Sequence, residues 1–166
     1  EMCIRDRIYT RYLTSIMILK RQEEFPHLPK VDMQVVEPWQ RIKLGNTYIK
    51  PFPVTHSIPD SMGISVETKH GNIVISGDLK LDHDGEEPSD KEKEIWGTIG
   101  KDNNILLIGD STNAERTGFS IPEIRVHTNI EEIIRSVKGR LIIGTFASQF
   151  ERMTVSYTHL TLPTIS

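Results

Sequence analysis

Cysteine is nearly absent from this sequence, since Cys3 is the only one among its 166 residues. A lone thiol excludes a disulfide within the chain. It also argues against the small secreted domains that disulfides stabilise, so a cytoplasmic protein is expected.

The sequence also lacks a long hydrophobic run and an excess of basic charge. No apolar run approaches the roughly 18 residues that a transmembrane helix needs, so no membrane partner is expected. The 20 Lys and Arg residues are outnumbered by 23 Asp and Glu residues, which gives a net charge of −3. This balance is not typical of a nucleic-acid-binding domain. It does not exclude a metal-dependent nuclease, because such an enzyme can hold phosphate through its cations and a local basic rim.

Two β-type runs, residues 62–68 and 72–76, are present and are separated by the turn signal Lys-His-Gly-Asn at 69–72. His56 precedes the first run and Asp78 follows the second. Gly71 allows the chain to reverse, so an antiparallel hairpin would bring the two outer ends together. An imidazole and a carboxylate at the rim of a sheet suit a divalent cation such as zinc or manganese.

The residues alone leave this interpretation open. His56 and Asp78 are equally compatible with an ordinary loop histidine and an ordinary turn residue, and zinc normally takes three or four protein ligands. Asp110 follows the apolar run at residues 104–108 and is followed by Ser111 and Thr112. Small polar residues after a strand build either a site rim or a simple Asx turn, and the pattern by itself favours the turn.

The remaining patterns predict a mixed α/β chain. The expected helices cover residues 9–25, residues 90–99 with Ser89 as N-cap, and residues 120–138 with a capping box of Ser120 and Glu123. The expected strands cover residues 33–36, 41–44 and 48–54, and the last one is expected to be an edge or irregular strand because of Pro51 and Pro53. The runs 104–108 and 141–146 are expected to be buried strands, and His83 is expected in a solvated loop.

Three blocks resemble a known family. The sequence H-S-I-P-D at 56–60, followed by G-D-L-K-L-D at 77–82, resembles the third and fourth metal motifs of the metallo-β-lactamase fold, and more specifically those of the ribonuclease J family. The sequence G-D-S-T-N-A-E at 109–115 resembles the family's approach to its β-CASP domain. The sequence G-R-L-I-I-G-T-F-A-S at 139–148 resembles the first strand of that domain. The resemblance covers residues 9–153.

The resemblance implies a fold, a division of the chain and an activity. It implies a partial metallo-β-lactamase fold over residues 8–119, with sheet layers flanked by helices, that runs into the start of a β-CASP domain at 120–154. Residues 1–7 and 155–166 resemble translated sequencing-adapter sequence and are expected to be foreign tails. The implied activity is hydrolysis of RNA from its 5′ end, internally, or both, by a homo-oligomeric protein with two Zn²⁺ ions per site, or with Mn²⁺ or Mg²⁺ instead.

The resemblance also assigns roles to residues. His56 matches a histidine that ligates one metal, and Asp78 matches the aspartate that bridges two metals and is catalytic. Asp110 matches an acid beside the metal site that supports a histidine of the β-CASP domain. Ser57, Asp60 and Lys80 lie in the same blocks and receive no role.

The chain departs from the family pattern in one respect. The motif H-x-H-x-D-H that the family carries upstream is absent from all 166 residues. We therefore expect a piece from the middle of a longer enzyme, which binds metal weakly and has no nuclease activity by itself. The alternatives are another hydrolase of this fold that acts on a small ester, thioester or lactam, and a non-catalytic module of the fold.

Overall fold

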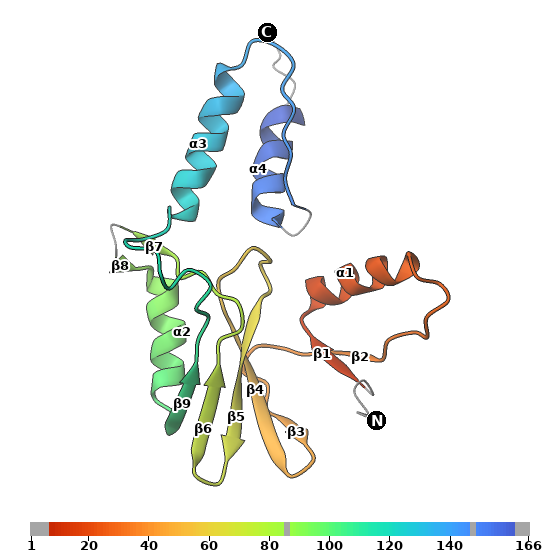
Figure 1. The fold of residues 1–166 in the computed structure, drawn as a ribbon, viewed down its shortest axis with the longest axis vertical. Helices are drawn as coiled ribbons and strands as arrows, with labels where there is room; N and C mark the ends of the chain where they lie inside the picture. Colours follow the sequence, from red (N-terminus) through yellow and green to blue (C-terminus); the bar gives the residue numbers. More distant parts are fainter. Residues whose placement is uncertain (1–6, 85–86, 147–148, 162–166) are drawn as a thin grey trace.

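A five-stranded mixed sheet with a helix packed against it forms the centre of this computed structural model (Figure 1). The structure describes residues 7–84, 87–146 and 149–161. In chain order the elements are β1 (Ile8–Thr10), α1 (Tyr12–Glu23), β2 (Met33–Val35), β3 (Ile42–Leu44), β4 (Thr47–Pro53), β5 (Met62–Thr68), β6 (Gly71–Ile75), β7 (His83–Asp84), β8 (Glu87–Pro88), α2 (Asp90–Gly100), β9 (Asn104–Ile108), α3 (Glu123–Ser136) and α4 (Phe150–Thr161).

The strand order β3-β4-β5-β6-β9 determines where the functional loops lie. Strands β3 to β6 pair antiparallel with their neighbours, and β9 pairs parallel with β6. Strands β4, β6 and β9 therefore run in the same direction and end at the same edge of the sheet. Loops that follow such carboxyl ends are a common place for ligand sites.

The predicted hairpin is confirmed. Strands β5 and β6 pair antiparallel, with Thr68 opposite Gly71 and Glu67 opposite Asn72. Gly71 has φ +140°, which side-chain-bearing residues rarely adopt, and a Cβ there would lie 2.7 Å from the Asn103 carbonyl oxygen. The turn thus requires glycine for both its conformation and its close contact.

Helix α2 covers one face of the sheet. Ser89 is its N-cap, as predicted, and accepts a hydrogen bond from the Glu92 amide. Ile95 and Ile99 are buried against the sheet, and Trp96 packs edge-on against Phe52 with 5.7 Å between ring centroids. The core members from both layers are Phe52, Val54, Val74, Ile95 and Ile99. A second buried cluster of Val36, Ile42 and Ile49 lies at the β3 end of the sheet.

Strand β4 lies inside the sheet, so the prediction of an edge strand is wrong for the strand as a whole. Strand β3 pairs only with the first part of β4, as far as Ile49. Pro51 and Pro53 lie beyond that point, where β5 is the paired neighbour. The Pro51 carbonyl accepts a hydrogen bond from the Trp39 amide at 2.7 Å on the open side. The prolines thus lie in the part of β4 that has no paired strand on the β3 side. Their lack of an N–H therefore removes no hydrogen bond between strands.

Two apolar runs that were expected to be buried are exposed. Strand β9 has the predicted bounds, but Ile105 to Ile108 are 49–60% exposed. Successive side chains of a strand point to opposite faces of the sheet, so the described part of the chain leaves both faces of β9 largely uncovered. Residues 141–146 form no strand, and Ile142 and Phe146 are exposed. A strand needs a hydrogen-bonded neighbour, and the described part of the chain places none beside residues 141–146. The last two residues of that block, 147 and 148, lie outside the described residues.

The helices differ from prediction at their ends. Residues 8–10 form β1, parallel to β2, so α1 begins at Tyr12 and not at residue 9. The capping box is wrong as well. Helix α3 begins at Glu123, with Pro122 at the N-cap position and no side-chain cap, and the Glu123 carboxylate pairs with Lys80 instead.

Helix α4 extends to Thr161 and therefore includes part of the expected C-terminal tail. Residues 1–6 and 162–166 of the two tails lie outside the described residues. Helices α3 and α4 stand side by side beyond the upper end of the sheet in Figure 1. Among the described residues, no helix combines the length and apolarity that a membrane crossing requires.

Candidate functional site

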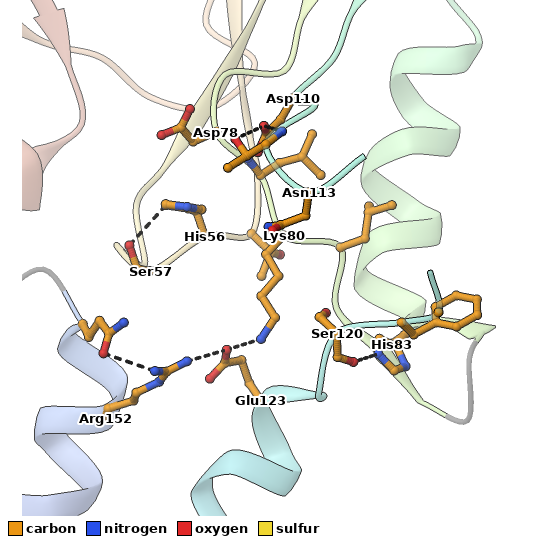
Figure 2. Close-up of a pocket in the computed structure, with 17 residues that line it drawn as sticks. His56, Ser57, Asp78, Lys80, His83, Asp110, Asn113, Ser120, Glu123 and Arg152 are labelled. Atoms are coloured by element: carbon orange, nitrogen blue, oxygen red, sulfur yellow. Dashed lines mark hydrogen bonds and ion pairs between the residues drawn. The ribbon is translucent and has the colours of Figure 1, made fainter. Parts of the chain in front are cut away.

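A pocket of about 770 Å³ opens where the loops after β4, β6 and β9 meet (Figure 2). His56 comes from the loop after β4, Asp78 from the loop after β6 and Asp110 from the loop after β9. All three line this pocket, so the structure brings together the three residues that the sequence singled out. Their assembly follows from the shared direction of the three strands.

His56 lies in a loop that is closed at its base. The Val54 amide donates to the Ser61 carbonyl at 3.1 Å, which holds the two ends of residues 55–61 together. The half-buried His56 ring places Nδ1 3.1 Å from the Ser57 hydroxyl. The loop of Asp78 joins this arrangement, because the Lys80 amide donates to the Thr55 carbonyl at 2.7 Å.

Asp110 accepts hydrogen bonds from two loops. Its Oδ1 accepts from the Thr112 hydroxyl at 2.5 Å and from the Thr112 amide at 2.8 Å, and its Oδ2 accepts from the Leu79 amide at 3.3 Å. These bonds, first those from Thr112, lower the pKa of Asp110, and the positive charge of His56 adds to the effect. The Asx turn that the sequence favoured is therefore present, and the same carboxylate also lines the pocket.

The opposite wall of the pocket carries an ion cluster that the sequence did not reveal. Lys80 pairs with Glu123 at the start of α3 and also donates to the Ile121 carbonyl at 3.0 Å. Arg152 of α4 lies 3.6 Å from the same carboxylate. Partial burial acts to raise the pKa of Glu123, but the Lys80 hydrogen bond and the positive charges of Lys80 and Arg152 outweigh it and lower that pKa.

His83 is not the solvated loop histidine that was expected. It is half-buried and lines the pocket, and its Nε2 lies 2.6 Å from the Ser120 carbonyl oxygen, which accepts the hydrogen bond. Its ring packs against Phe119 with 5.4 Å between centroids. His83 therefore connects the segment after Asp78 to the segment that leads into α3.

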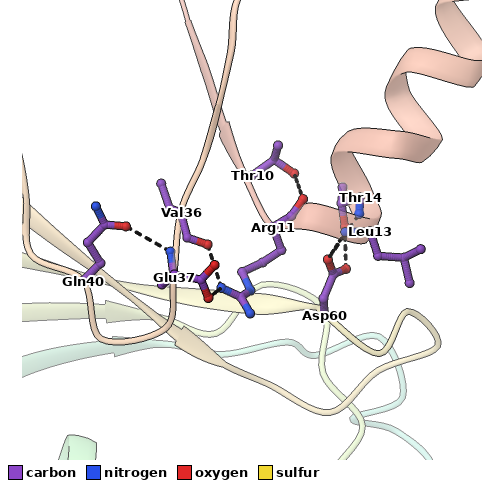
Figure 3. A network of polar contacts seen from close by, with 8 residues as sticks. All are labelled: Thr10, Arg11, Leu13, Thr14, Val36, Glu37, Gln40 and Asp60. Atoms are coloured by element: carbon purple, nitrogen blue, oxygen red, sulfur yellow. Dashed lines mark hydrogen bonds and ion pairs between the residues drawn. The ribbon is translucent and has the colours of Figure 1, made fainter.

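Asp60 was also assigned no role, although the structure gives it several partners. Its carboxylate accepts hydrogen bonds from Leu13 and Thr14 at the start of α1 (Figure 3). No sequence signal links these residues, because they lie 46 and 47 positions apart. The Lys80–Glu123 pair spans 43 positions and is equally invisible to local patterns.

The donors in the pocket do not by themselves make a complete metal centre. An imidazole and a carboxylate suit zinc or manganese in kind. Within residues 7–84, 87–146 and 149–161, however, no three His, Cys, Asp or Glu side chains are grouped closely enough to hold one metal ion. The residues present therefore fit a metal in chemistry but not in number, and no reaction step can be assigned to a metal held by this chain alone.

Comparison with known proteins places the chain beside one set of relatives. It is 35% identical over 147 residues to the ribonuclease J of Mycoplasma genitalium, 33% identical over 148 residues to that of Thermus thermophilus, and 31% identical over 149 residues to that of Synechocystis. These matches cover 88–89% of the chain but only 23–26% of the relatives. No protein-family model matches the chain.

A solved structure supports the fold. A protein of unknown function from Enterococcus faecalis superposes with a TM-score of 0.71 over 90% of this chain and 38% of its own, at 17% sequence identity. Over nearly its whole length the chain is similar in sequence to the ribonuclease J proteins, and it spans about a quarter of the length of the relatives it matches.

Proposed function

We propose that this chain is part of a metal-dependent ribonuclease of RNA processing and decay, and that it supplies one wall of the active site. One observation carries the proposal. In a chain 31–35% identical to proteins named ribonuclease J, the loops after three strands of the same direction bring His56, Asp78 and Asp110 to one pocket.

The proposal includes a fold and a division of the chain. Residues 8–119 would be the later part of a metallo-β-lactamase segment, and residues 120–154 would begin a β-CASP domain. The mixed sheet with α2 packed on it, followed by the change to the helices α3 and α4, supports this division. The short length of the chain relative to its relatives supports a further part of the protein that completes both units.

The proposal also gives each residue a role. His56 and Asp78 would be metal ligands, and Asp78 and Asp110 would be the catalytic carboxylates of the complete site. Two Zn²⁺ ions, or Mn²⁺ or Mg²⁺ in their place, would activate water and stabilise the charge that develops on phosphodiester hydrolysis. This chain's own contribution is to hold the His56 ring and the two carboxylates at one rim, through the Lys80–Thr55 and Leu79–Asp110 hydrogen bonds.

The substrate would be RNA, cleaved from the 5′ end, internally, or both, by a cytoplasmic homo-oligomer. Lys80 and Arg152 face the pocket from the wall opposite the carboxylates (Figure 2). Together with the Glu123 carboxylate between them, they leave one net positive charge on this wall despite the net charge of −3 for the chain.

The test uses the complete protein that contains this chain and a 5′-labelled RNA. We expect His56→Ala and Asp78→Asn each to lower the cleavage rate by more than about 100-fold, since loss of even an outer-shell partner costs about 10- to 100-fold. His70→Ala is the matched control, because His70 lies exposed in the β5–β6 turn at the far end of the hairpin. Wild-type cleavage by both site variants would refute the proposed site, and we expect no cleavage by the 166-residue chain alone.

A further inference from the structure

The first turn of α1 has no capping side chain of its own. The N-cap position is held by Arg11, which makes no side-chain cap hydrogen bond, and the first turn contains no acidic residue. A helix start of this kind leaves backbone N–H groups unpaired and an uncompensated positive dipole end.

Asp60 supplies the missing cap from a distant part of the sequence. Its Oδ2 accepts hydrogen bonds from the Leu13 amide at 2.6 Å and from the Thr14 amide at 3.2 Å. Its Oδ1 accepts from the Thr14 hydroxyl at 2.8 Å. Leu13 and Thr14 are the second and third residues of α1, whose amides an N-cap side chain normally satisfies.

The capping carboxylate belongs to the same closed loop as His56. Residues 55–61 are tied at their base by Val54 and Ser61, and the Ser61 amide and hydroxyl both donate to the Ile58 carbonyl, at 3.0 and 2.8 Å. The Lys80–Thr55 bond ties one side of this loop to the segment that carries Asp78. Among the described residues, the hydrogen bonds that tie the loop to α1 all end on Asp60 (Figure 3).

The space around His56 shows why this second tie matters. A cavity of about 450 Å³ separates the loop from the start of α1, and His56, Asp60, Asp78 and Thr14 all line it. His56 therefore lines both the larger pocket and this cavity. Without a tie across the smaller cavity, the loop could move into it and change the orientation of the imidazole in the larger pocket.

We propose that Asp60 is a positioning residue. By capping α1 from 47 positions away, it fixes loop 55–61 and thereby the orientation of His56 in the pocket. The functional value of this position rests on the proposed role of His56 as a metal ligand. The positioning itself does not depend on that role.

The experiment uses isotope-labelled 166-residue chain and four variants. Asp60→Ala removes the cap, Asp60→Asn keeps an acceptor without the charge, and Thr14→Val removes only the hydroxyl bond. Lys20→Gly is the matched control, because Lys20 is an exposed residue of α1 and glycine there weakens the helix to an extent similar to the loss of a cap. The readouts are amide hydrogen exchange of α1 and of residues 55–61, and the His56 ring resonances at one fixed pH.

We expect Asp60→Ala to raise exchange in loop 55–61 by roughly 5-fold, the factor that corresponds to a lost cap of about 1 kcal/mol, and to shift the His56 resonances. Thr14→Val and Asp60→Asn should give smaller changes in the same direction. Lys20→Gly should raise exchange in α1 and leave the loop and His56 unchanged. If Asp60→Ala does not fold, the two milder variants decide the question.

The proposal is overturned if the Asp60 and Thr14 variants leave the loop and His56 at their wild-type values, or if Lys20→Gly disturbs them equally. Addition of Zn²⁺ to the complete protein that contains this chain separates this result from the proposed function. His56 resonances that respond to Asp60→Ala in the 166-residue chain but not to Zn²⁺ in the complete protein would support the positioning and count against His56 as a ligand.

Discussion

At the scale of single residues, close packing between strands β4, β5 and β6 restricts the size of the side chains that fit there. Phe52 is fully buried, and its ring lies over Gly63 of β5, the residue opposite it in the register. A Cβ at position 63 would lie 2.4 Å from Phe52 Cζ and 2.9 Å from the Ile75 carbonyl oxygen. Glycine is therefore required here because no space remains for a Cβ. Its backbone conformation is not the reason, since its φ lies outside the left-handed region.

We expect Gly63→Ala to destabilise the chain by about 1–3 kcal/mol, the usual cost of overpacking a filled core. Gly97→Ala is the matched control, since no atom lies within 4 Å of the added methyl in the exposed middle of α2. That change should stabilise the chain by about 0.5–1 kcal/mol. Urea denaturation measures both, and equal midpoints for Gly63→Ala and the wild type would contradict the expected clash.

At the scale of elements, the segment after β6 acts as the connection between the sheet and the helices α3 and α4. Within six residues it carries three side chains with different contacts. Asp78 lines the pocket, Lys80 pairs with Glu123, and His83 donates a hydrogen bond to the Ser120 carbonyl. The start of α3 is therefore held by partners outside the helix. The Lys80–Glu123 pair is mostly shielded from solvent, so it is screened less than a surface pair.

We expect Lys80→Met to raise the pKa of Glu123. The variant loses the Lys80 hydrogen bond and charge that favour the ionised carboxylate, while the partial burial that disfavours it remains. The pKa of Glu123 is lowered in the folded chain, so its contribution to stability is present above its ordinary pKa of 4.5 and is lost as the pH falls through the folded value. The variant should therefore lose less stability than the wild type below about pH 4.5.

Titration of side-chain carboxyl carbons by NMR measures the pKa, and thermal unfolding between neutral and acid pH measures the stability. Lys69→Met removes the same charge from the exposed β5–β6 turn and should leave Glu123 unchanged. An identical Glu123 titration in both variants would show that the pair does not determine this pKa.

At the scale of the whole molecule, the described part of the chain leaves apolar side chains of β9 and of residues 141–146 uncovered. Strand β9 presents Ile105 to Ile108 on its two faces, and residues 141–146 present Ile142 and Phe146. An exposed apolar edge strand is a template for pairing with another strand. The chain spans about a quarter of its relatives, and in the complete protein we propose that further chain covers these surfaces.

We expect the 166-residue chain to self-associate through β9, and Leu107→Lys to suppress this, because a charge on the exposed edge opposes pairing. Leu107 is 60% exposed, so lysine should fit there without disturbing the core. Sedimentation velocity over a range of concentrations should return the mass of the variant to the 19.0 kDa monomer. Thr98→Lys, on the exposed face of α2, is the control and should associate as the wild type does.

The sequence by itself determined the features that depend on neighbouring residues. The Gly71 turn and the two β-type runs beside it predicted the β5–β6 hairpin, Ser89 predicted the start of α2, and the apolar run predicted the bounds of β9. The hairpin also predicted that His56 and Asp78 would meet, and they share one pocket. Local turn chemistry and periodicity suffice for these features, because the interactions that decide them lie within a few residues.

Only the tertiary structure decided the features that depend on which distant segments of the chain become neighbours in space. Strand β4 keeps its prolines inside the sheet because β3 is short, and the β9 side chains are exposed because the described part of the chain leaves both faces of that strand largely uncovered. The cap of α1 by Asp60 and the Lys80–Glu123 pair join residues more than 40 positions apart. The free energy of such contacts arises only after the chain has folded, so no local pattern in the sequence encodes them.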